Sequence, residues 1–397
     1  MNDAQRYARF CRALAGESLP AGIVDLEAVD TNLARLVQPI RAAGKALRIA
    51  TKSIRCPDLI DYIAKRSGAI GLMTYSAAET AMLAARGHRD LLLAYPTLQA
   101  SDLDAIATAN RTATAAIVID CFEHLDPLAA AAARAGTSVP VVIDVDMSYR
   151  PLDRGPHLGV RRSPLRSAAE VVALAELIKP PLRFHGLLGY EAQIAGLGDA
   201  TPSSTATNVV KRAIKHRSAP YVRELRRACV DGLRARELPP TIVNGGGTGS
   251  VAWSAGDSAL TEITVGSGFL ASSLFDHYRD LTLVPAAGFA LQIVRRPAPD
   301  IVTCLGGGFI ASGAPGPDRL PMPWLPAGIE LLAAEGAGEV QTPLRTTTSL
   351  ALGDPVFFRH AKAGELAEHL CEYLLVRGSA IESRAKTYRG MGHCFLG

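Results

Sequence analysis

Short apolar segments alternate with longer, charged, helix-like stretches from about residue 20 to about residue 270, and this alternation limits the fold more than any other feature. It predicts a parallel sheet whose strands are joined by crossover helices. About eight repeats in ~250 residues is the size of a (β/α)8 TIM-type barrel. We therefore predict this α/β architecture, with a doubly wound sheet as the alternative. The strand-like segments are residues 21–26, 46–51, 69–75, 90–96, 115–121, 140–147, 184–190, 241–247 and 260–268.

The pattern changes after about residue 285. Short strand-like segments are then separated by turns rich in proline and glycine, such as residues 312–328. Turn residues at this density are typical of short strands joined by loops. We predict a barrel domain over residues 18–285 and a smaller β-rich domain over 286–397, on which residues 1–17 pack.

Charge and hydropathy exclude several classes of partner. The 397 residues include 42 Lys and Arg against 38 Asp and Glu, a net charge of +4. This excess is too small to predict binding to nucleic acid or to an anionic membrane. No apolar run approaches the ~20 residues of a membrane span, and the N-terminal residues lack the apolar core of a signal peptide. We expect a cytoplasmic protein with no nucleic-acid or membrane partner.

The seven cysteines are scattered, and no two of them have CxxC spacing. An odd, dispersed set is typical of reduced thiols and not of a disulfide framework or a structural zinc site. This distribution agrees with the expectation of a cytoplasmic protein.

Lys52 follows the apolar segment 46–51, in RIATKSIR. At the end of a barrel strand it would lie at the C-terminal rim, where barrel active sites are found. A desolvated lysine can lose its proton and form a Schiff base with a carbonyl. The alternative is an ordinary surface lysine flanked by Arg48 and Arg55.

Two glycine-rich turns follow the last two strand-like segments, in TIVNGGGTGS (241–250) and TVGSGF (264–269). Glycines let the backbone approach an anion closely, and Thr and Ser hydroxyls add donors. Turns after the last strands of a barrel commonly bind phosphate. We favour a phosphate site over simple tight turns. The glycines do not fit the G-x-G-x-x-G spacing of a nicotinamide site.

Together these segments resemble a known family. PAGIVDLEAVDTNLARL, LRIATKSIR, GLLGYEAQ, NGGGTGS and TEITVGSGF are similar to segments of fold-type III pyridoxal-phosphate enzymes. The nearest group is that of D-threonine aldolase and D-serine dehydratase, related to the barrel domain of alanine racemase. The resemblance covers residues 18–285 well and residues 286–397 loosely. It implies bound pyridoxal 5′-phosphate, a small amino-acid substrate and a homodimer.

The resemblance also assigns roles to residues. Lys52 matches the lysine that holds the cofactor covalently, and Ala50 replaces a histidine that the family often has. His157 falls where the family usually has an arginine near the cofactor ring, and Arg161 is a nearby alternative. The residues expected to contact the cofactor are Lys52, Arg48, His157, Tyr190, Gly246, Gly247, Thr248, Gly266 and Ser267.

A second group of residues that the family uses in its active site is altered in this chain. D-Threonine aldolases and D-serine dehydratases bind a divalent metal with a His-x-Asp or His-x-Cys pair, which RHAKAGE replaces with His360 and Lys362. Strand periodicity would place these two side chains on one face, and an ammonium there would oppose a metal ion. We predict that His360 acts as acid/base, that Lys362 supplies positive charge, and that no metal is needed. The alternative is a metal on His360 with Glu365 or Cys394.

These roles predict a pyridoxal-phosphate-dependent lyase that cleaves a β-hydroxy-α-amino acid by retro-aldol chemistry. The D configuration is implied by the resemblance alone. The first alternative is a dehydratase of the D-serine type. The second is a racemase, with Tyr373 or Tyr388 as its second base. The third is a non-catalytic cofactor carrier, which the long C-terminal region disfavours.

Overall fold

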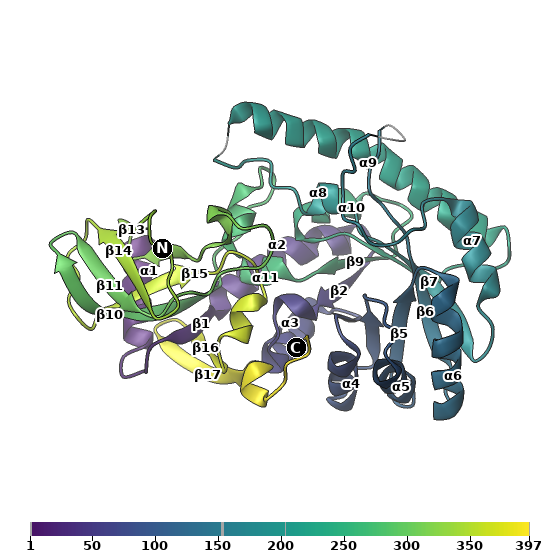
Figure 1. Cartoon of the computed structure of the whole chain (residues 1–397), viewed down its shortest axis with the longest axis horizontal. Helices are drawn as coiled ribbons and strands as arrows, with labels where there is room; N and C mark the ends of the chain where they lie inside the picture. Colours follow the sequence, from purple (N-terminus) through teal and green to yellow (C-terminus); the bar gives the residue numbers. More distant parts are fainter. Residues whose placement is uncertain (1, 152–154, 203, 397) are drawn as a thin grey trace.

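Eight parallel strands close into a barrel in a computed structural model of the chain, which describes residues 2–151, 155–202 and 204–396 (Figure 1). Strand β9 pairs with β2 and closes the ring. The predicted TIM-type barrel is therefore confirmed, and the doubly wound alternative is wrong. The barrel strands are β2 (Ala46–Ala50), β3 (Gly71–Thr74), β4 (Asp90–Leu93), β5 (Thr114–Ile119), β6 (Val139–Asp144), β7 (Leu182–Gly189), β8 (Ile242–Gly245) and β9 (Glu262–Val265).

Helices return the chain from the end of one barrel strand to the start of the next. Residues that commonly cap helices stand at several of their ends. Ser76 caps α4 through its hydroxyl, and Gly68 and Gly136 end α3 and α6 in the left-handed conformation that glycine adopts readily. The main barrel helices are α2 (Leu26–Ala42), α3 (Pro57–Ser67), α4 (Ala77–Ala85), α5 (Ala100–Ala109), α6 (Leu125–Ala135), α7 (Ala168–Leu177), α9 (Thr205–Arg234) and α10 (Val251–Ala255).

A second sheet of nine strands confirms the predicted β-rich region and lies beside the barrel (Figure 1). Helix α1 (Asp3–Ala13) packs on this sheet, where Tyr7 meets Phe357 edge-on with ring centroids 5.9 Å apart. The strands that follow the barrel are β10 (Ala287–Ala298), β11 (Ile301–Leu305), β12 (Met322–Leu325), β13 (Ile329–Leu331), β14 (Gln341–Thr346), β15 (Pro355–Arg359), β16 (Glu372–Arg377) and β17 (Ala380–Lys386).

The ninth strand of this sheet is β1 (Ala21–Asp25), which the repeat pattern had predicted as a barrel strand. It pairs antiparallel with β10 and parallel with β16. All five of its residues are buried. A run buried on both faces looks the same in sequence whether it lies in a barrel or in the middle of a mixed sheet. The prediction that this segment is a barrel strand is therefore corrected. Asp25, its last residue, caps the N-terminus of α2, and α2 leads to the barrel strand β2.

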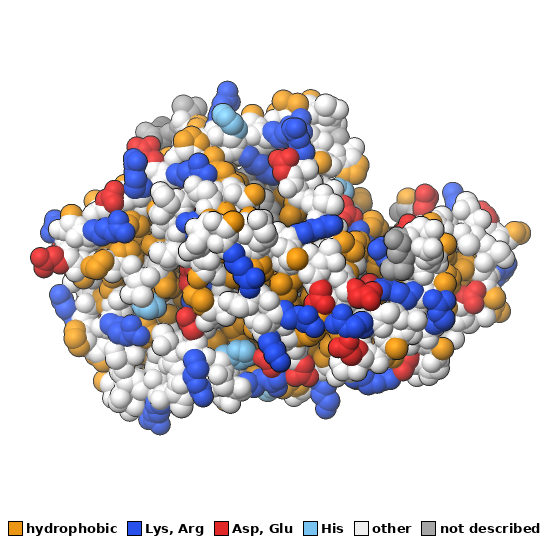
Figure 2. Space-filling model, turned by 180° about the vertical axis from the view of Figure 1, so that it is seen from behind, with side chains coloured by type: hydrophobic (Ala, Val, Ile, Leu, Met, Phe, Trp, Pro, Cys, Tyr) orange, Lys and Arg blue, Asp and Glu red, His pale blue; other side chains and the backbone are white. Residues whose placement is uncertain are grey.

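The outer surface mixes charges of both signs. On the face seen in Figure 2, Lys and Arg side chains are spread over both domains and lie among Asp and Glu side chains. Within the described part of the chain, no helix combines the length and apolar character needed to cross a membrane.

Candidate active site

A cavity of about 1290 Å³ lies at the carboxyl end of the barrel strands, and residues of the β-rich region complete its wall. This is the end of a barrel at which active sites are built. Eight of the eleven residues predicted to contact the cofactor or to act in catalysis line the cavity: Lys52, Tyr190, Gly246, Gly247, Thr248, Gly266, Ser267 and Lys362. Three others do not: Arg48, His157 and His360.

Lys52 lies in a short 3-10 turn, η1 (Thr51–Ser53), directly after β2. Its Nζ donates a hydrogen bond of 3.0 Å to the hydroxyl of Tyr95, which follows β4. Burial on its own raises the pKa of Tyr95, but the charges of Lys52 and Arg162 outweigh it and lower that pKa below its ordinary value. Tyr95 was not among the site residues predicted from the sequence.

Arg162 places a guanidinium in the wall of the cavity. Its guanidinium carbon lies 4.9 Å from the ring centroid of Tyr95 and 5.9 Å from that of Tyr190. The ring of His157 instead contacts the carbonyl of Val160, 3.2 Å away. The sequence predicted His157 at this place, with Arg161 as the alternative. The side chain that lines the cavity is that of Arg162, the residue after Arg161.

The two glycine-rich turns form one wall of the cavity. A Cβ at Gly247 would lie 3.1 Å from the Cβ of Ala195 and 3.2 Å from the Cε2 of Tyr190. Gly246 adopts a φ of +82°, in the left-handed region that glycine favours. The hydroxyl of Ser267 lies 3.0 Å from that of Ser53, beside Lys52. This wall therefore presents backbone and hydroxyl groups, as a phosphate site requires.

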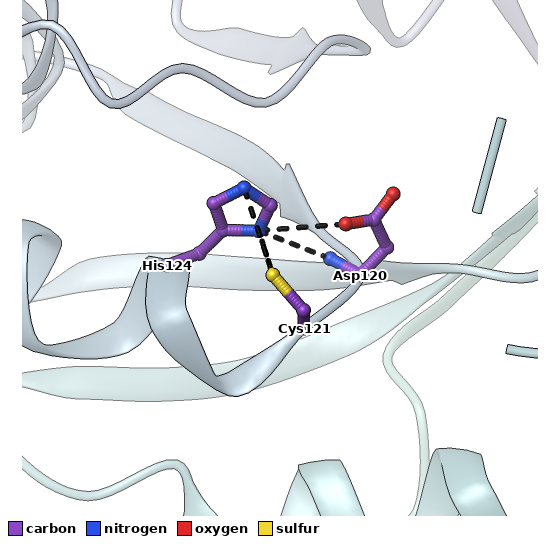
Figure 3. A group of neighbouring side chains, drawn as sticks. All are labelled: Asp120, Cys121 and His124. Atoms are coloured by element: carbon purple, nitrogen blue, oxygen red, sulfur yellow. Dashed lines mark hydrogen bonds and ion pairs between the residues drawn. The ribbon is translucent and has the colours of Figure 1, made fainter. Parts of the chain in front are cut away.

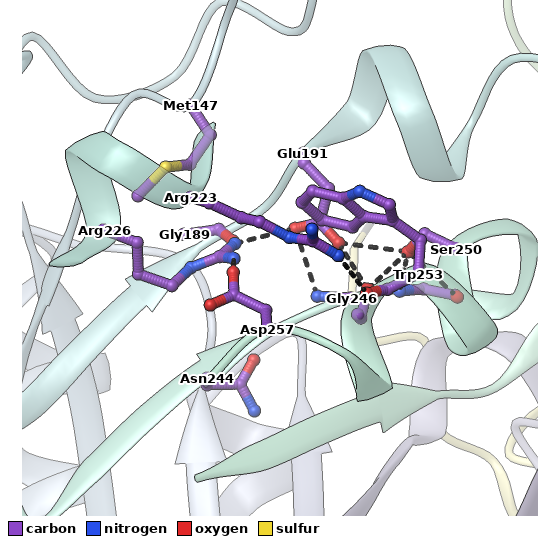
Figure 4. Close-up of polar contacts among 12 residues, drawn as sticks. Met147, Gly189, Glu191, Arg223, Arg226, Asn244, Gly246, Ser250, Trp253 and Asp257 are labelled. Atoms are coloured by element: carbon purple, nitrogen blue, oxygen red, sulfur yellow. Dashed lines mark hydrogen bonds and ion pairs between the residues drawn. The ribbon is translucent and has the colours of Figure 1, made fainter. Parts of the chain in front are cut away.

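A buried polar network supports the glycine turn from behind (Figure 4). The carboxylate of Glu191 is fully buried. It accepts hydrogen bonds from the backbone N–H of Gly246 at 3.2 Å, from the hydroxyl of Ser250 at 3.0 Å and from that of Ser254 at 2.8 Å. These contacts fix the direction in which the turn faces the cavity.

Arg226 balances the charge of this network from helix α9. Its guanidinium bonds to Glu191 at 3.0 Å, to the carbonyl of Gly189 at 3.0 Å, and to Asp257. Buried charges persist when they are paired and hydrogen-bonded in this way. The pairing joins α9 to the carboxyl end of β7 and to Asp257, two residues after α10.

Arg48 lies inside the barrel, below the cavity. Its guanidinium forms a two-pronged ion pair with Glu262, at 2.7 and 2.9 Å, and a third contact with Asp90 at 2.8 Å. The side chains of alternate strand residues point the same way, so Arg48 lies one inward step beneath Ala50, which does line the cavity. Arg48 therefore supports the floor of the cavity. Because it does not line the cavity, it is not placed to make the direct contact with a cofactor that the sequence had predicted.

His360 and Lys362 do not share a face, so the sequence prediction on this point is wrong. Strand β15 ends at Arg359, and the period-two rule stops with it. His360 is buried, and burial, reinforced by Arg359, lowers its pKa to about 4. Lys362 instead lines the cavity and donates to the hydroxyl of Ser312 at 3.1 Å. The acid/base role predicted for His360 therefore has no access to the cavity.

The residues near His360 do not fit a divalent metal. Lys362 has no lone pair when charged, and Glu365 accepts a hydrogen bond from the backbone of Ser312 at 3.1 Å. Among the described residues, no group of three His, Cys, Asp or Glu side chains converges around His360. The alternative of a metal on His360 with Glu365 or Cys394 gains no support.

The two tyrosines considered as second bases for a racemase also lie away from the cavity wall. Tyr373 and Tyr388 are each 1% exposed. The hydroxyl of Tyr388 donates to Glu79 at 2.7 Å. Burial raises the pKa of both tyrosines. Neither is placed to exchange a proton with a molecule in the cavity.

Curated relatives share the barrel region of this chain. The 3-hydroxy-D-aspartate aldolase of Paracoccus denitrificans (strain Pd 1222) is 23% identical over 249 residues, which cover 62% of this chain and 59% of that protein. The D-threonine aldolase of an Arthrobacter species is 25% identical over 259 residues, which cover 64% and 61%. The matches thus span about three-fifths of each relative's length.

Solved structures match nearly the whole chain. The D-threonine aldolase of Filomicrobium marinum superposes with a TM-score of 0.81 at 20% identity, covering 95% of this chain and 96% of that one. The D-threo-3-hydroxyaspartate dehydratase of Delftia sp. HT23 gives 0.72 at 19% identity, covering 94% and 98%. These likenesses establish that the barrel and the β-rich region form one shared fold. The model of the alanine racemase N-terminal domain matches residues 24–271, so the chain belongs to that family, as the sequence motifs indicated.

Proposed function

We propose that this protein is a pyridoxal-phosphate-dependent aldolase that cleaves a β-hydroxy-α-amino acid, D-configured at Cα. The observation that carries the proposal is the position of Lys52, at the barrel rim and hydrogen-bonded to Tyr95 inside the cavity. The aldolases among the relatives support the reaction class and the configuration.

The residues of the cavity fit pyridoxal 5′-phosphate. Lys52 offers an amine for a covalent link, and the turn at Gly246 and Gly247 offers a wall that a Cβ would crowd. Thr248 and Ser267 add hydroxyl groups along that wall. When bound, the cofactor supplies an electron-accepting ring for cleavage of the Cα–Cβ bond. Lys52 would hold it, and these turns would hold its phosphate.

Three other residues of the cavity, Tyr95, Arg162 and Lys362, have separate roles in the proposed reaction. Tyr95 holds or accepts a proton beside the Nζ of Lys52, because neighbouring cations stabilise its ionised form. Arg162 keeps positive charge over the faces of Tyr95 and Tyr190. Lys362 is paired only weakly, with a neutral hydroxyl, and is free to attract a carboxylate of the substrate. This set replaces the predicted partnership of His360 and Lys362.

An assay of purified protein with D- and L-β-hydroxy amino acids tests the reaction class. Retro-aldol cleavage releases an aldehyde together with glycine. Dehydration releases a 2-oxo acid and ammonia, and racemization releases the enantiomer. We expect aldehyde and glycine in equal amounts from D substrates. A 2-oxo acid as the main product would replace the proposal with the dehydratase alternative, and no turnover of any substrate would favour a carrier.

We also infer that the enzyme is a homodimer. Leu396 lines the cavity with 71% of its surface exposed, and Ile310, two residues before the cavity-lining Ser312, is 50% exposed. Exposed apolar side chains at the mouth of a cavity favour cover by a partner subunit, and such cover would keep water from the reacting carbon. Light scattering tests this inference, and a fully active monomer would contradict it.

A cytoplasmic location is proposed on the state of the thiols. All seven cysteines are free in the structure, and three of them are buried. Free thiols persist in a reducing compartment. Fractionation of the native cells followed by immunodetection would test this, and recovery from an oxidising compartment would contradict it.

A further inference from the structure

A cluster of three potential metal ligands lies at the barrel rim, outside the residues that line the cavity (Figure 3). Strand β5 ends at Ile119, and Asp120 and Cys121 follow it directly. His124 closes the 3-10 turn η2 (Phe122–His124), which leads into α6. The motif is therefore Asp-Cys-x-x-His, within a single tight turn.

The three side chains converge on one point. The Sγ of Cys121 lies 3.3 Å from the Nδ1 of His124, and the Oδ1 of Asp120 lies 3.5 Å from the same Nδ1. All three ligand atoms fall within 4.8 Å of one another. A catalytic relay of Cys, His and Asp would use the two different nitrogens of the imidazole. Here both the thiol and the carboxylate lie nearest to Nδ1, which also accepts a hydrogen bond of 3.4 Å from the backbone N–H of Asp120. The three side chains are therefore not arranged as a relay, and they are close enough together to serve as ligands of one ion.

The separations match one bound ion of the right size. A tetrahedral zinc ion, with bonds of about 2.3 Å to sulfur and about 2.0 Å to nitrogen and oxygen, would hold sulfur and nitrogen about 3.5 Å apart. It would hold nitrogen and oxygen about 3.3 Å apart. The observed distances of 3.3 and 3.5 Å differ from these values by about 0.2 Å. The thiol lies 3.9 Å from the Nε2 of the same ring, so it sits beside the imidazole. Closing the site therefore requires the ring to turn so that its Nδ1 lone pair points between the thiol and the carboxylate.

The chemistry of the three ligands selects the kind of ion. A thiolate, an imidazole and a carboxylate suit a borderline ion such as Zn²⁺, whereas Ca²⁺ and Mg²⁺ require mainly oxygen ligands. All three residues are half-buried, which leaves an open side for a water molecule as the fourth ligand. We propose that Asp120, Cys121 and His124 form a zinc site that clamps the turn between β5 and α6.

Metal content per chain tests the site in the untagged holoenzyme. The protein is stripped with a chelator, dialysed against Zn²⁺ and analysed for zinc. We expect one zinc per chain in the wild type and loss of that zinc in Cys121→Ala and in His124→Ala. The matched controls are Cys371→Ala and His369→Ala, which alter an exposed cysteine and an exposed histidine of the β-rich region and should keep the zinc.

Two further measurements test the identity of the ligands and the folding of the variants. Zinc-edge X-ray absorption should show one sulfur ligand among nitrogen and oxygen ligands, and circular dichroism should show that each variant is folded. Absence of zinc from the folded wild type, equal zinc in Cys121→Ala, or a zinc shell without sulfur would overturn the proposal. In any of these cases, the three residues would form only a hydrogen-bonded turn without a metal ion. Because the readout is metal content, it stands whether or not the proposed aldolase activity is found.

Discussion

The Nζ of Lys52 donates to the hydroxyl of Tyr95 across 3.0 Å, and Arg162 lies over the ring of that tyrosine. The two residues follow different strands, β2 and β4, and the closed barrel brings their ends to one rim. Neither residue is close to the other in sequence. Their contact makes Tyr95 the first group to test for proton transfer at the proposed cofactor lysine.

The pH profile of kcat/KM should depend on Tyr95 and shift when Arg162 is changed. If Tyr95 accepts a proton, activity rises as the pH rises through its pKa. Arg162 helps to lower that pKa, so Arg162→Gln should raise it and move the rising limb to higher pH. Tyr95→Phe should remove the limb and lower kcat by about 100-fold or more. An unchanged profile in both variants would remove Tyr95 from the mechanism.

Covalent attachment at Lys52 is the second prediction. The purified protein should be yellow, should lose its visible absorbance on borohydride reduction, and should carry the reduced cofactor on the peptide that contains Lys52. Lys52→Ala should lose the link. Lys362→Ala serves as a control, because Lys362 also lines the cavity but should leave the link intact. Reduced cofactor on any other lysine would refute the assignment.

The glycine wall gives a prediction about cofactor affinity. A side chain at Gly247 would crowd Ala195 and Tyr190, so Gly247→Val should weaken binding of pyridoxal 5′-phosphate by about tenfold or more. Phosphate-free pyridoxal should bind poorly to the wild type. Gly256→Ala is the matched control, because its φ is −80° and the nearest atom to an added Cβ is 3.4 Å away. Equal affinity in Gly247→Val and wild type would place the phosphate elsewhere.

Much of this site was predictable because strand ends and glycine-rich turns can be recognised from short sequence motifs. Lys52 and the turn at Gly246 were found from short motifs after apolar runs. Tyr95 was not, because a tyrosine after a strand has the same local pattern whether it faces a cavity or packs in the core. His360 was misplaced because its role depended on β15 continuing past Arg359. The place where a strand ends depends on packing that distant segments provide.

The same limit applies to the fold. The eight-strand repeat identified the barrel, since alternation is a local property of the chain. The position of β1 was not predictable, because its partners β10 and β16 lie far along the chain. Burial on both faces removes the alternation that would have marked it as part of a mixed sheet.

Glu79 should make stability fall as the pH rises. Burial raises its pKa to about 7, against 4.5 for an ordinary glutamate, although Tyr388 and Thr51 oppose the shift. The folded state therefore binds this proton more tightly than the unfolded state. The stabilisation is complete below about pH 4.5 and is lost as the pH rises through about 7. A shift of this size corresponds to about 3 kcal/mol.

Urea unfolding of wild type and Glu79→Gln across this range measures the effect. The neutral amide cannot ionise, so the variant should lack this pH-dependent loss of the free energy of unfolding. Glu335→Gln, at an exposed position, is the control and should follow the wild type. Parallel pH curves for wild type and Glu79→Gln would show that the carboxyl does not titrate in this way.

The last prediction is that turnover does not require a divalent metal. Lys362 lines the cavity wall, and its ammonium would repel a cation placed there. The proposed zinc site at Asp120, Cys121 and His124 lies outside the cavity lining, so emptying it should leave the chemistry intact. Dialysis against EDTA should therefore remove bound metal without lowering kcat. Lys362→Met should raise KM more than it lowers kcat, because the lysine attracts the substrate before the bond breaks. Loss of activity on chelation that Mn²⁺ or Zn²⁺ restores would contradict this account, and a Lys362→Met enzyme with wild-type KM would remove the lysine from substrate binding.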